Sequence, residues 1–166
     1  MKSPFKSFML QDDGIIPNNP DLPVLVYEGP FKDCPNEIEH IFNRHQWSNS
    51  WINGIFDFHH YHSNAHEVLG VKAGSAVVLI GGEKGQHLNL SVGDVLVLPA
   101  GTGHKKLESS QDFQVVGAYP NGQSYNMRKS DPSIHSQSMS EIANVSIPQT
   151  DPVYGDSGPL LQAWKK

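Results

Sequence analysis

The sequence predicts a mainly β protein of the sandwich or jelly-roll class, folded as one domain. Its 15 glycines and 12 prolines divide the 166 residues into short segments, and only 17% of the residues are charged, against 37% that are hydrophobic. Many segments carry alternating or β-branched residues between glycine-rich turns, which is typical of strands in such folds. A chain of this length buries roughly 70% of its unfolded surface on folding, which is enough for one sizeable core.

The N-terminal part of the chain predicts two strands and one helix. Residues 5–11 alternate weakly, as an edge strand does, and residues 24–27 form a short apolar strand. Residues 33–46 change to helical spacing, with Asp33 suited to the N-cap and Pro35 to the first turn. We therefore expect one well-defined helix in this half of the chain.

Strands dominate the middle of the chain. Trp47 and Trp51 precede them in a predicted loop, where we expect these indoles to cover one end of a barrel. Residues 95–98 are continuously apolar, so both faces of that strand should be covered, one by the core and the other by a helix, the tail or a partner subunit. The expected strands are residues 55–62, 67–72, 76–80, 87–90, 95–98, 105–108 and 113–119.

The C-terminal part predicts a short helix and a strap. Ser138 and Glu141 resemble a capping box that opens a helix running through Val145. Residues 150–164 place apolar anchors between prolines and glycines, and such a tail straps across its own domain or a neighbour. The single domain of residues 1–166 thus divides into N-terminal strands and a helix over 1–51, a core barrel over about 52–120, and the strap over 121–166.

Four residues have the spacing of a metal site. Alternate side chains of a strand share a face, so His60 and His62 point the same way. Glu67 follows after a turn that can bring the next strand alongside, and His104 comes from a later strand. Three neutral imidazoles and one carboxylate suit a first-row divalent metal and leave coordination positions open for water or substrate.

The same residues lie in two motifs that resemble those of the cupins. The second motif departs from the family pattern at Glu108, where the family has asparagine. Residues 22–31 and 150–164 are also similar to the uncharacterised bacterial YjlB-type branch of the RmlC-like cupins. The first motif consists of Gly54, His60, His62, Glu67 and Gly74, and the second of Gly93, Pro99, Gly101 and His104.

This resemblance implies a double-stranded β-helix, or jelly-roll barrel, with one helix in the N-terminal half and a short C-terminal helix. It also implies one divalent metal, Fe, Mn, Ni or Zn, held by His60, His62, Glu67 and His104. Cupins include dioxygenase-like oxidoreductases and isomerases or epimerases in which the metal is a Lewis acid. The alternative is a non-enzymatic protein that binds or senses a small molecule through its metal, because the fold alone does not determine an activity.

Four further residues are candidates for the surroundings of the metal. Phe56 and Phe58 share the parity of His60 in the predicted strand, which indicates an apolar, mostly dry cavity with the ion at its end. His66 is adjacent to Glu67 and should point away from the ion if strand geometry holds there, or it can instead hydrogen-bond to a ligand or line the mouth of the site. Tyr119 is a cavity candidate because it ends a strand that is otherwise apolar.

Glu108 is the one candidate for a catalytic base. It has the parity of His104, so it can point toward the cavity, where apolar surroundings would raise its pKa. The alternative is that Glu108 is a charged strand end in solvent beside Lys105 and Lys106.

Composition and charge bear on partners and location. The net charge is −5 and no run of lysine or arginine is long enough to offer a phosphate-binding stripe, so we expect a small-molecule partner and no nucleic acid. No stretch of 18 apolar residues and no signal-peptide pattern is present, so we expect a cytoplasmic protein without a membrane partner. The single Cys34 cannot form an internal disulfide. We also expect a homodimer, because a partner subunit could cover the second apolar face of residues 95–98 and could receive the strap of residues 150–164.

Overall fold

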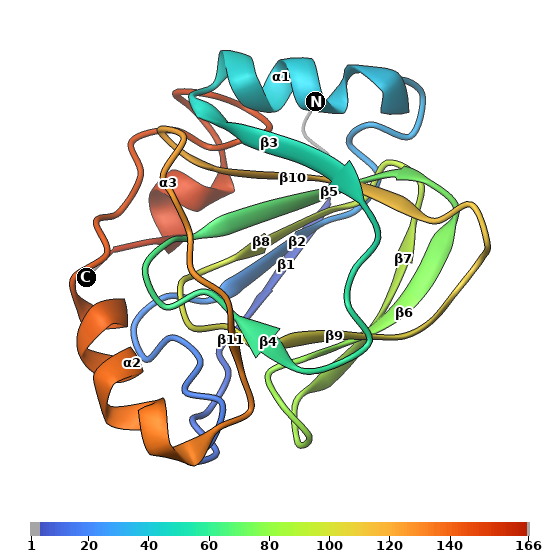
Figure 1. Ribbon diagram of the computed structural model, residues 1–166. Helices are drawn as coiled ribbons and strands as arrows, with labels where there is room; N and C mark the ends of the chain where they lie inside the picture. The colour runs from blue at the N-terminus through green and yellow to red at the C-terminus, as the bar shows by residue number, and fades with distance from the viewer. Residues whose placement is uncertain (1–3, 166) are drawn as a thin grey trace.

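The computed structural model describes residues 4–165 and confirms the mainly β prediction. Two antiparallel sheets enclose an apolar core, and the helices lie outside them (Figure 1). Many strands that are neighbours in a sheet are distant in sequence, as in a jelly roll. Among the described residues, no helix combines the length and the hydrophobicity needed to traverse a lipid bilayer.

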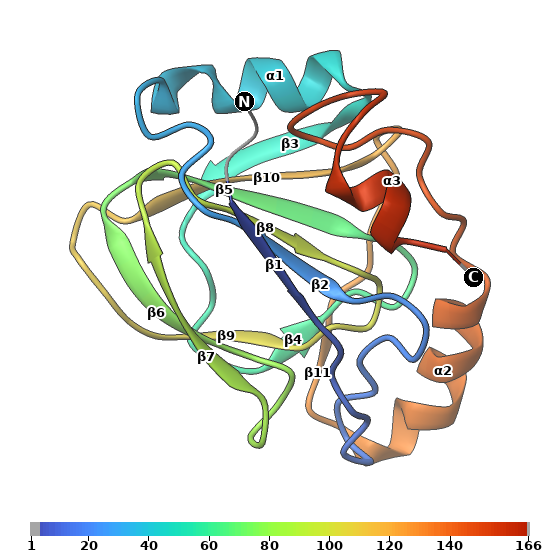
Figure 2. The same cartoon turned by 180° about the vertical axis from the view of Figure 1, so that it is seen from behind.

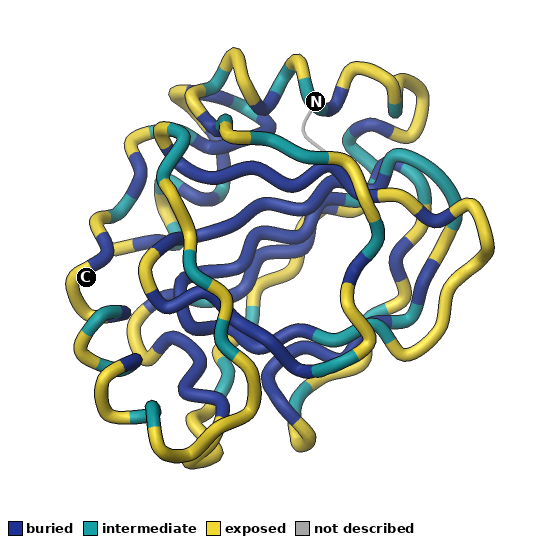
Figure 3. The backbone as a smooth tube through the Cα atoms, in the orientation of Figure 1, coloured by how far each residue is buried: buried dark blue, intermediate teal, exposed yellow. Residues whose placement is uncertain are grey.

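The larger sheet has six strands and the smaller sheet has five. The four central strands of the larger sheet are buried along most of their length (Figure 3). In spatial order the larger sheet contains β1 (Phe5–Phe8), β2 (Val24–Tyr27), β8 (Val95–Leu98), β5 (Glu67–Ala73), β10 (Gln114–Pro120) and β3 (Trp47–Asn53). The smaller sheet contains β11 (Arg128–Lys129), β4 (His60–Tyr61), β9 (His104–Ser109), β6 (Ser75–Ile80) and β7 (Gln86–Ser91). The helices are α1 (Ile38–Arg44), α2 (His135–Ala143), α3 (Pro159–Ala163) and the short 3-10 helices Pro35–Glu37 and Pro132–Ile134.

Helix α1 covers the outer face of the larger sheet beside β3 and β10 (Figures 1 and 2). Its buried residues Ile38 and Phe42 sit close above β5 because Gly70 has no side chain: a Cβ at that position would lie 2.6 Å from Ile38 Cγ2. The helix begins with a 3-10 turn whose N-cap is Cys34, without a side-chain capping bond. The prediction of Asp33 as N-cap is therefore wrong, because the tighter first turn starts one residue later.

Trp47 and Trp51 belong to β3, so the prediction of a loop at these residues is wrong. Gln46 adopts a φ of 65°, which ends the helical path and turns the chain directly into the strand. Trp47 is fully buried, and its Nε1 donates to the Thr150 carbonyl oxygen over 3.0 Å. Burial of this indole, together with the pairing of β3 with β10, fixes the strand.

The strand predicted over residues 55–62 is reduced to β4. Residues 54–59 have no regular strand pairing, although the Phe56 carbonyl still accepts a hydrogen bond from Lys106 N over 2.9 Å. At β4, His60 pairs directly with His104 of β9. Phe56 is consequently 53% exposed, at the end of the irregular segment, and does not lie on a continuous buried face.

The two faces of β8 form two apolar layers. Leu96 and Leu98 pack between the sheets, together with residues of the smaller sheet such as Val78. Val95 and Val97 lie in a second cluster, which includes residues of α1 and of the C-terminal tail. The chain itself therefore covers both faces, and a homodimer stays a prediction that this strand does not require.

Helix α2 begins before Ser138, so the predicted capping box is wrong. Ser138 is fully buried inside the helix, and its hydroxyl shares a 2.8 Å hydrogen bond with Tyr61 OH. Glu141 accepts a hydrogen bond from Ser63 Oγ over 2.8 Å. These two side chains attach α2 to the region of β4, and Asp131 caps the preceding 3-10 turn instead.

The C-terminal tail straps across its own domain. Asp151 is fully buried and accepts hydrogen bonds from Tyr27 OH at 2.5 Å and from the backbone N–H of Leu160 at 3.2 Å. Burial and the neighbouring Asp151 carboxylate raise the pKa of Tyr27, which keeps this hydroxyl a donor. Trp164 Nε1 closes the strap by donating to the Pro23 carbonyl oxygen over 2.9 Å.

Replacing Asp151 by alanine should lower the free energy of unfolding by about 3 kcal/mol, because the Tyr27 hydroxyl and several tail N–H groups would be buried without an acceptor. Urea titration followed by circular dichroism measures this change. Asp156→Ala, at an exposed position of the same tail, is the control and should change stability by less than about 0.5 kcal/mol. Equal unfolding midpoints for the two variants would contradict the role given to Asp151.

Candidate functional site

A cavity of about 520 Å³ lies between the two sheets. This volume is within the range of small-molecule sites. Its walls are mostly apolar and aromatic, and the histidines and the charged side chains lie on or directly after strands β4, β5 and β9. The lining residues are Trp51, Ile52, Asn53, Gly54, Ile55, Phe56, His60, His62, Glu67, Leu69, His104, Lys106, Tyr119, Tyr125 and Met127.

All four predicted ligands line this cavity and are buried. His60 lies on β4 and His62 just after it, while Glu67 begins β5 and His104 begins β9. Pairing of β4 with β9 brings the first and last of these residues together, although they are distant in sequence. The larger sheet supplies the carboxylate, and the smaller sheet with its adjoining loop supplies the imidazoles.

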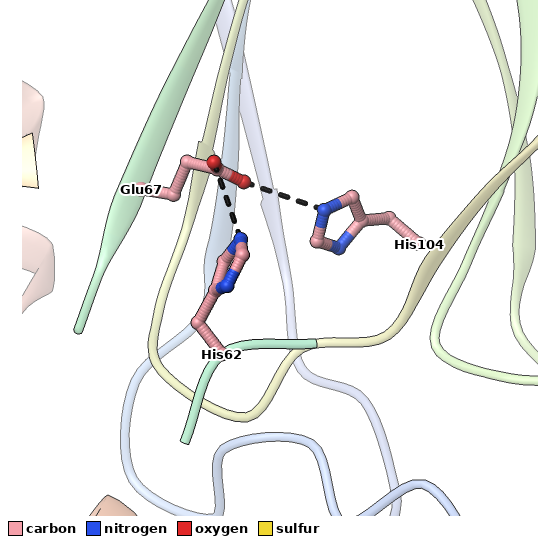
Figure 4. Close-up of side chains that lie close together, drawn as sticks. All are labelled: His62, Glu67 and His104. Atoms are coloured by element: carbon pink, nitrogen blue, oxygen red, sulfur yellow. Dashed lines mark ion pairs between the residues drawn. The ribbon is translucent and has the colours of Figure 1, made fainter. Parts of the chain in front are cut away.

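Three of the four side chains converge closely (Figure 4). His62 Nε2 lies 3.3 Å from Glu67 Oε2, and His104 Nε2 lies 3.3 Å from Glu67 Oε1. The ligand atoms of these three residues are all within 4.8 Å of one another. His60 is not part of that close group, but its ring centroid lies 4.0 Å from that of His104.

Each of the three histidines uses Nδ1 for a backbone carbonyl oxygen. The partners are Phe58 for His60 at 3.0 Å, Thr102 for His104 at 3.0 Å, and Asn126 for His62. A carbonyl oxygen only accepts, so Nδ1 must carry the proton in all three rings. The lone pair of a neutral ring is then on Nε2, which is the arrangement expected for a metal-ligating histidine.

One carboxylate oxygen of Glu67 accepts a hydrogen bond, and the other has no hydrogen-bond partner. Tyr119 OH donates to Oε2 over 2.6 Å, and Trp51 Nε1 donates to the same Tyr119 oxygen over 2.8 Å. Oε1 is buried and has no hydrogen-bond partner. The two aromatic residues thus hold the carboxylate in one orientation, with its unsatisfied oxygen on the side of His104.

Gly117 makes the Trp51 contact possible. It pairs with Trp51 across strands β10 and β3, and a Cβ at Gly117 would lie 2.3 Å from atoms of the indole ring. Only glycine therefore lets the ring lie across β10 and reach the Tyr119 hydroxyl. The sequence signal for this contact is a glycine in an otherwise apolar strand.

The buried carboxylate determines the charge state of the site. Burial alone would raise the pKa of Glu67, but the charge of His62 and the close approach of the His104 and His62 rings outweigh burial and hold the pKa below its usual range. Burial would lower the pKa of His62, but the Glu67 carboxylate outweighs it and raises the pKa. Burial, reinforced by His104, lowers the pKa of His60 to about 3. The site thus combines a buried anion with imidazole nitrogens.

These residues fit a divalent transition metal. An orphaned, buried carboxylate oxygen is costly unless a donor or a cation faces it. Imidazole nitrogen and carboxylate oxygen are the donors that Fe, Mn, Ni and Zn accept in proteins. The backbone bonds to Nδ1 and the Tyr119 bond to Glu67 are the kind of outer contacts that orient such ligands.

Comparison with known proteins decides the family. A family model described as Cupin matches residues 53–142, which is more than half of the chain. The chain belongs to the cupin family. The uncharacterised protein YjlB of Bacillus subtilis (strain 168) is 45% identical to it over 166 residues, and the alignment covers 100% of both chains.

Solved structures with similar folds are more distant from this cupin. Procruciferin, an 11S globulin from Brassica napus, is 19% identical with a TM-score of 0.42, over 72% of this chain and 30% of its own. The lyase DddQ from Ruegeria pomeroyi DSS-3 is 15% identical with a TM-score of 0.40, over 79% of this chain and 53% of its own. Acireductone dioxygenase from Bacillus anthracis, with cadmium in its active centre, is 20% identical with a TM-score of 0.36, over 54% of this chain and 59% of its own.

The four surrounding residues named from the sequence of this cupin fall into two groups. Phe56 and Tyr119 line the cavity. Phe58 stacks on Phe56 with ring centroids 4.9 Å apart but is not a lining residue. His66 is not a lining residue either: its Nδ1 accepts from Ala100 N over 2.9 Å and its ring packs 4.7 Å from that of Trp164, away from the cavity. Its alternation with Glu67 along the chain explains this placement.

The structure contradicts the proposal of Glu108 as a catalytic base. Glu108 is exposed and does not line the cavity. Val77 of β6 pairs with Glu108, whereas Val78 pairs with Lys106, so Leu107 is an extra residue on β9. This bulge breaks the alternation that starts at His104, and Glu108 therefore loses the parity on which the prediction depended.

Several cavity residues were not singled out from the sequence. Lys106 has the same parity as His104 and precedes the bulge, so the strand pattern contained a usable signal. Trp51 was expected in a loop, which hid its position on β3. Tyr125 and Met127 lie in a segment without strand or helix periodicity, and nothing in the local sequence places them at the cavity.

Proposed function

We propose that this cupin is an enzyme that binds one divalent transition metal through His60, His62, Glu67 and His104 and acts on a small organic molecule in the adjoining cavity. The main support is the state of the donor atoms. Each histidine commits Nδ1 to a backbone carbonyl, and Glu67 Oε1 has no hydrogen-bond partner. Fe, Mn, Ni and Zn all suit this donor set.

His60 completes the set in this proposal. Its ring is buried against that of His104, and its Nδ1 is already engaged by the Phe58 carbonyl. His60 lies outside the group of ligand atoms that are within 4.8 Å of one another, and a change of side-chain torsion that brought its Nε2 closer would cost on the order of 1 kcal/mol. Structural zinc sites in small peptides bind their ion with about 10 kcal/mol or more, so a fraction of such a binding energy compensates the adjustment.

The chemistry depends on the metal and on the cavity walls. When bound, the metal supplies Lewis-acid polarisation of a carbonyl or hydroxyl oxygen or, as iron, redox chemistry with O₂. Tyr119 holds Glu67 in place from behind. The apolar walls, which include Phe56, Tyr125 and Met127, offer exposed apolar surface that a bound substrate would cover.

A ligand screen separates the enzymatic branches from plain binding. Compounds that raise the melting temperature of the metal-loaded protein are incubated with it in air and under anoxic conditions, and substrate loss is followed by mass spectrometry. Consumption in air alone supports a dioxygenase, and conversion in both conditions supports Lewis-acid chemistry such as isomerisation. Stabilising compounds that are never converted would contradict the enzyme proposal and support a binding protein.

Replacing His62 by alanine should weaken Zn²⁺ or Co²⁺ binding by more than about 100-fold, because one donor is lost and Glu67 loses its partner. Competition with a chromogenic chelator measures the affinity. His87→Ala, on the exposed face of β7, should bind metal like the natural protein. Far-UV circular dichroism should be unchanged in both variants, since neither residue belongs to an apolar core cluster. Full metal affinity in His62→Ala would contradict the ligand assignment.

Replacing Tyr119 by phenylalanine should weaken metal binding by roughly 10-fold to 100-fold, because the Glu67 carboxylate loses the hydrogen bond that orients it. The same chelator competition measures it. Tyr125→Phe is a matched control, since its ring stacks on that of Tyr119 at 4.1 Å but its hydroxyl has no hydrogen bond among the described residues. If both variants keep the affinity of the natural protein, Tyr119 does not position Glu67.

A further inference from the structure

The cavity contains one cationic side chain that the metal site does not use. Among the lining residues, the formally charged side chains are Glu67 and Lys106. Lys106 lies two residues after His104 on β9 and before the bulge, so both side chains are on the same face of the strand. The Cα atoms of His104 and Lys106 are separated by roughly 7 Å along the strand. A small molecule in the cavity can therefore contact both the Lys106 ammonium group and the region of the proposed ligands.

Lys106 has no acidic partner in the described part of the chain. The ion pairs there involve Lys6, Arg128 and several histidines, and none of them includes Lys106. The carboxylate of Glu67 is already held by Tyr119 and faces His62 and His104. A cation that lines a partly apolar cavity without a counter-charge gains most from an anionic ligand.

The other walls of the cavity are apolar and aromatic, and they suit a ligand whose uncharged part is apolar. Tyr119 and Tyr125 are stacked with ring planes 18° apart, which presents a flat aromatic surface. Phe56, Met127 and Ile52 are 53%, 44% and 39% exposed, although each is a large apolar side chain, and all three line the same cavity. Contact with an apolar molecule would remove this surface from water.

We propose that the molecule bound in the cavity is a small organic monocarboxylate with an apolar or aromatic body, and that Lys106 is the residue that selects its anionic group. The proposal rests on the proposed function, because the divalent ion adds to the positive charge of Lys106 and together they outweigh the single Glu67 carboxylate. One lysine suits a singly charged carboxylate. Phosphate groups are more often bound by several backbone N–H donors or by arginine, and no arginine lines this cavity.

The test compares acids with their neutral amides. Benzoate and benzamide, phenylacetate and phenylacetamide, and hexanoate and hexanamide are titrated into Zn²⁺-loaded protein by calorimetry. At least one acid should bind more tightly than its amide, and Lys106→Met should weaken that acid by about tenfold while leaving the amide unchanged. Lys106→Arg should retain the preference, because it retains the charge.

Lys105→Met is the matched control. Lys105 is the adjacent residue of β9, points to the other face and does not line the cavity, so its replacement removes the same charge from the surface without changing the site. Circular dichroism and metal content are recorded for every variant. A preference for the acid that disappears in Lys106→Met and persists in Lys105→Met supports the proposal.

Three results would overturn it: no acid binds more tightly than its amide, none of the six probes binds, or the two methionine variants lose affinity equally. Failure of the proposed catalysis appears only as a lack of turnover, which these binding titrations do not measure. Failure of the proposed metal site gives a different pattern, because the natural protein would then hold no metal. The same titrations on metal-free protein still measure the contribution of Lys106 in that case, since its charge does not depend on the ion.

Discussion

The candidate site depends on the buried negative charge of Glu67. Glu67 is almost fully shielded from water at the start of a central strand, and an unpaired carboxylate in such a place costs several kcal/mol. Oε2 of Glu67 accepts a hydrogen bond from the Tyr119 hydroxyl, which offsets part of this cost. Oε1 lies beside His104 without a hydrogen bond. A cation bound at this point would complete the compensation. The three imidazoles, fixed through Nδ1, present the nitrogen atoms that such a cation requires.

The jelly-roll topology explains why these groups meet. Strand β5 carries Glu67 in the middle of the larger sheet, and β4 and β9 carry His60 and His104 in the smaller one. Support comes from outside this core as well. The backbone carbonyl of Asn126 accepts a hydrogen bond from His62, and the side-chain oxygen of Asn126 accepts one from Ser63 N. The segment after β10 therefore orients a proposed ligand, and it also places Tyr125 at the cavity. The C-terminal third is therefore part of the site and not only a cover.

Much of the fold and the family could be predicted from the sequence, because short apolar strands and fixed glycine spacings are local signals. That the four proposed ligands lie together at one cavity could also be predicted, since alternate positions on a strand share a face. The errors have specific physical causes. A bulge at Leu107 reversed the parity of Glu108, and burial of Trp47 turned an expected loop into β3. Ser138 and Glu141 bind α2 to the core, a tertiary role that looks the same in sequence as a capping box.

Elemental mass spectrometry of tag-free protein, with Glu67→Ala and His104→Ala prepared in parallel, tests the central claim most directly. The account predicts close to one equivalent of a divalent transition metal per chain in the natural protein and a large loss in both variants. The identity of the ion then favours redox or Lewis-acid chemistry. Protein that contains no metal and takes up none of Fe, Mn, Ni or Zn on addition would contradict the account, as would variants that retain the full equivalent.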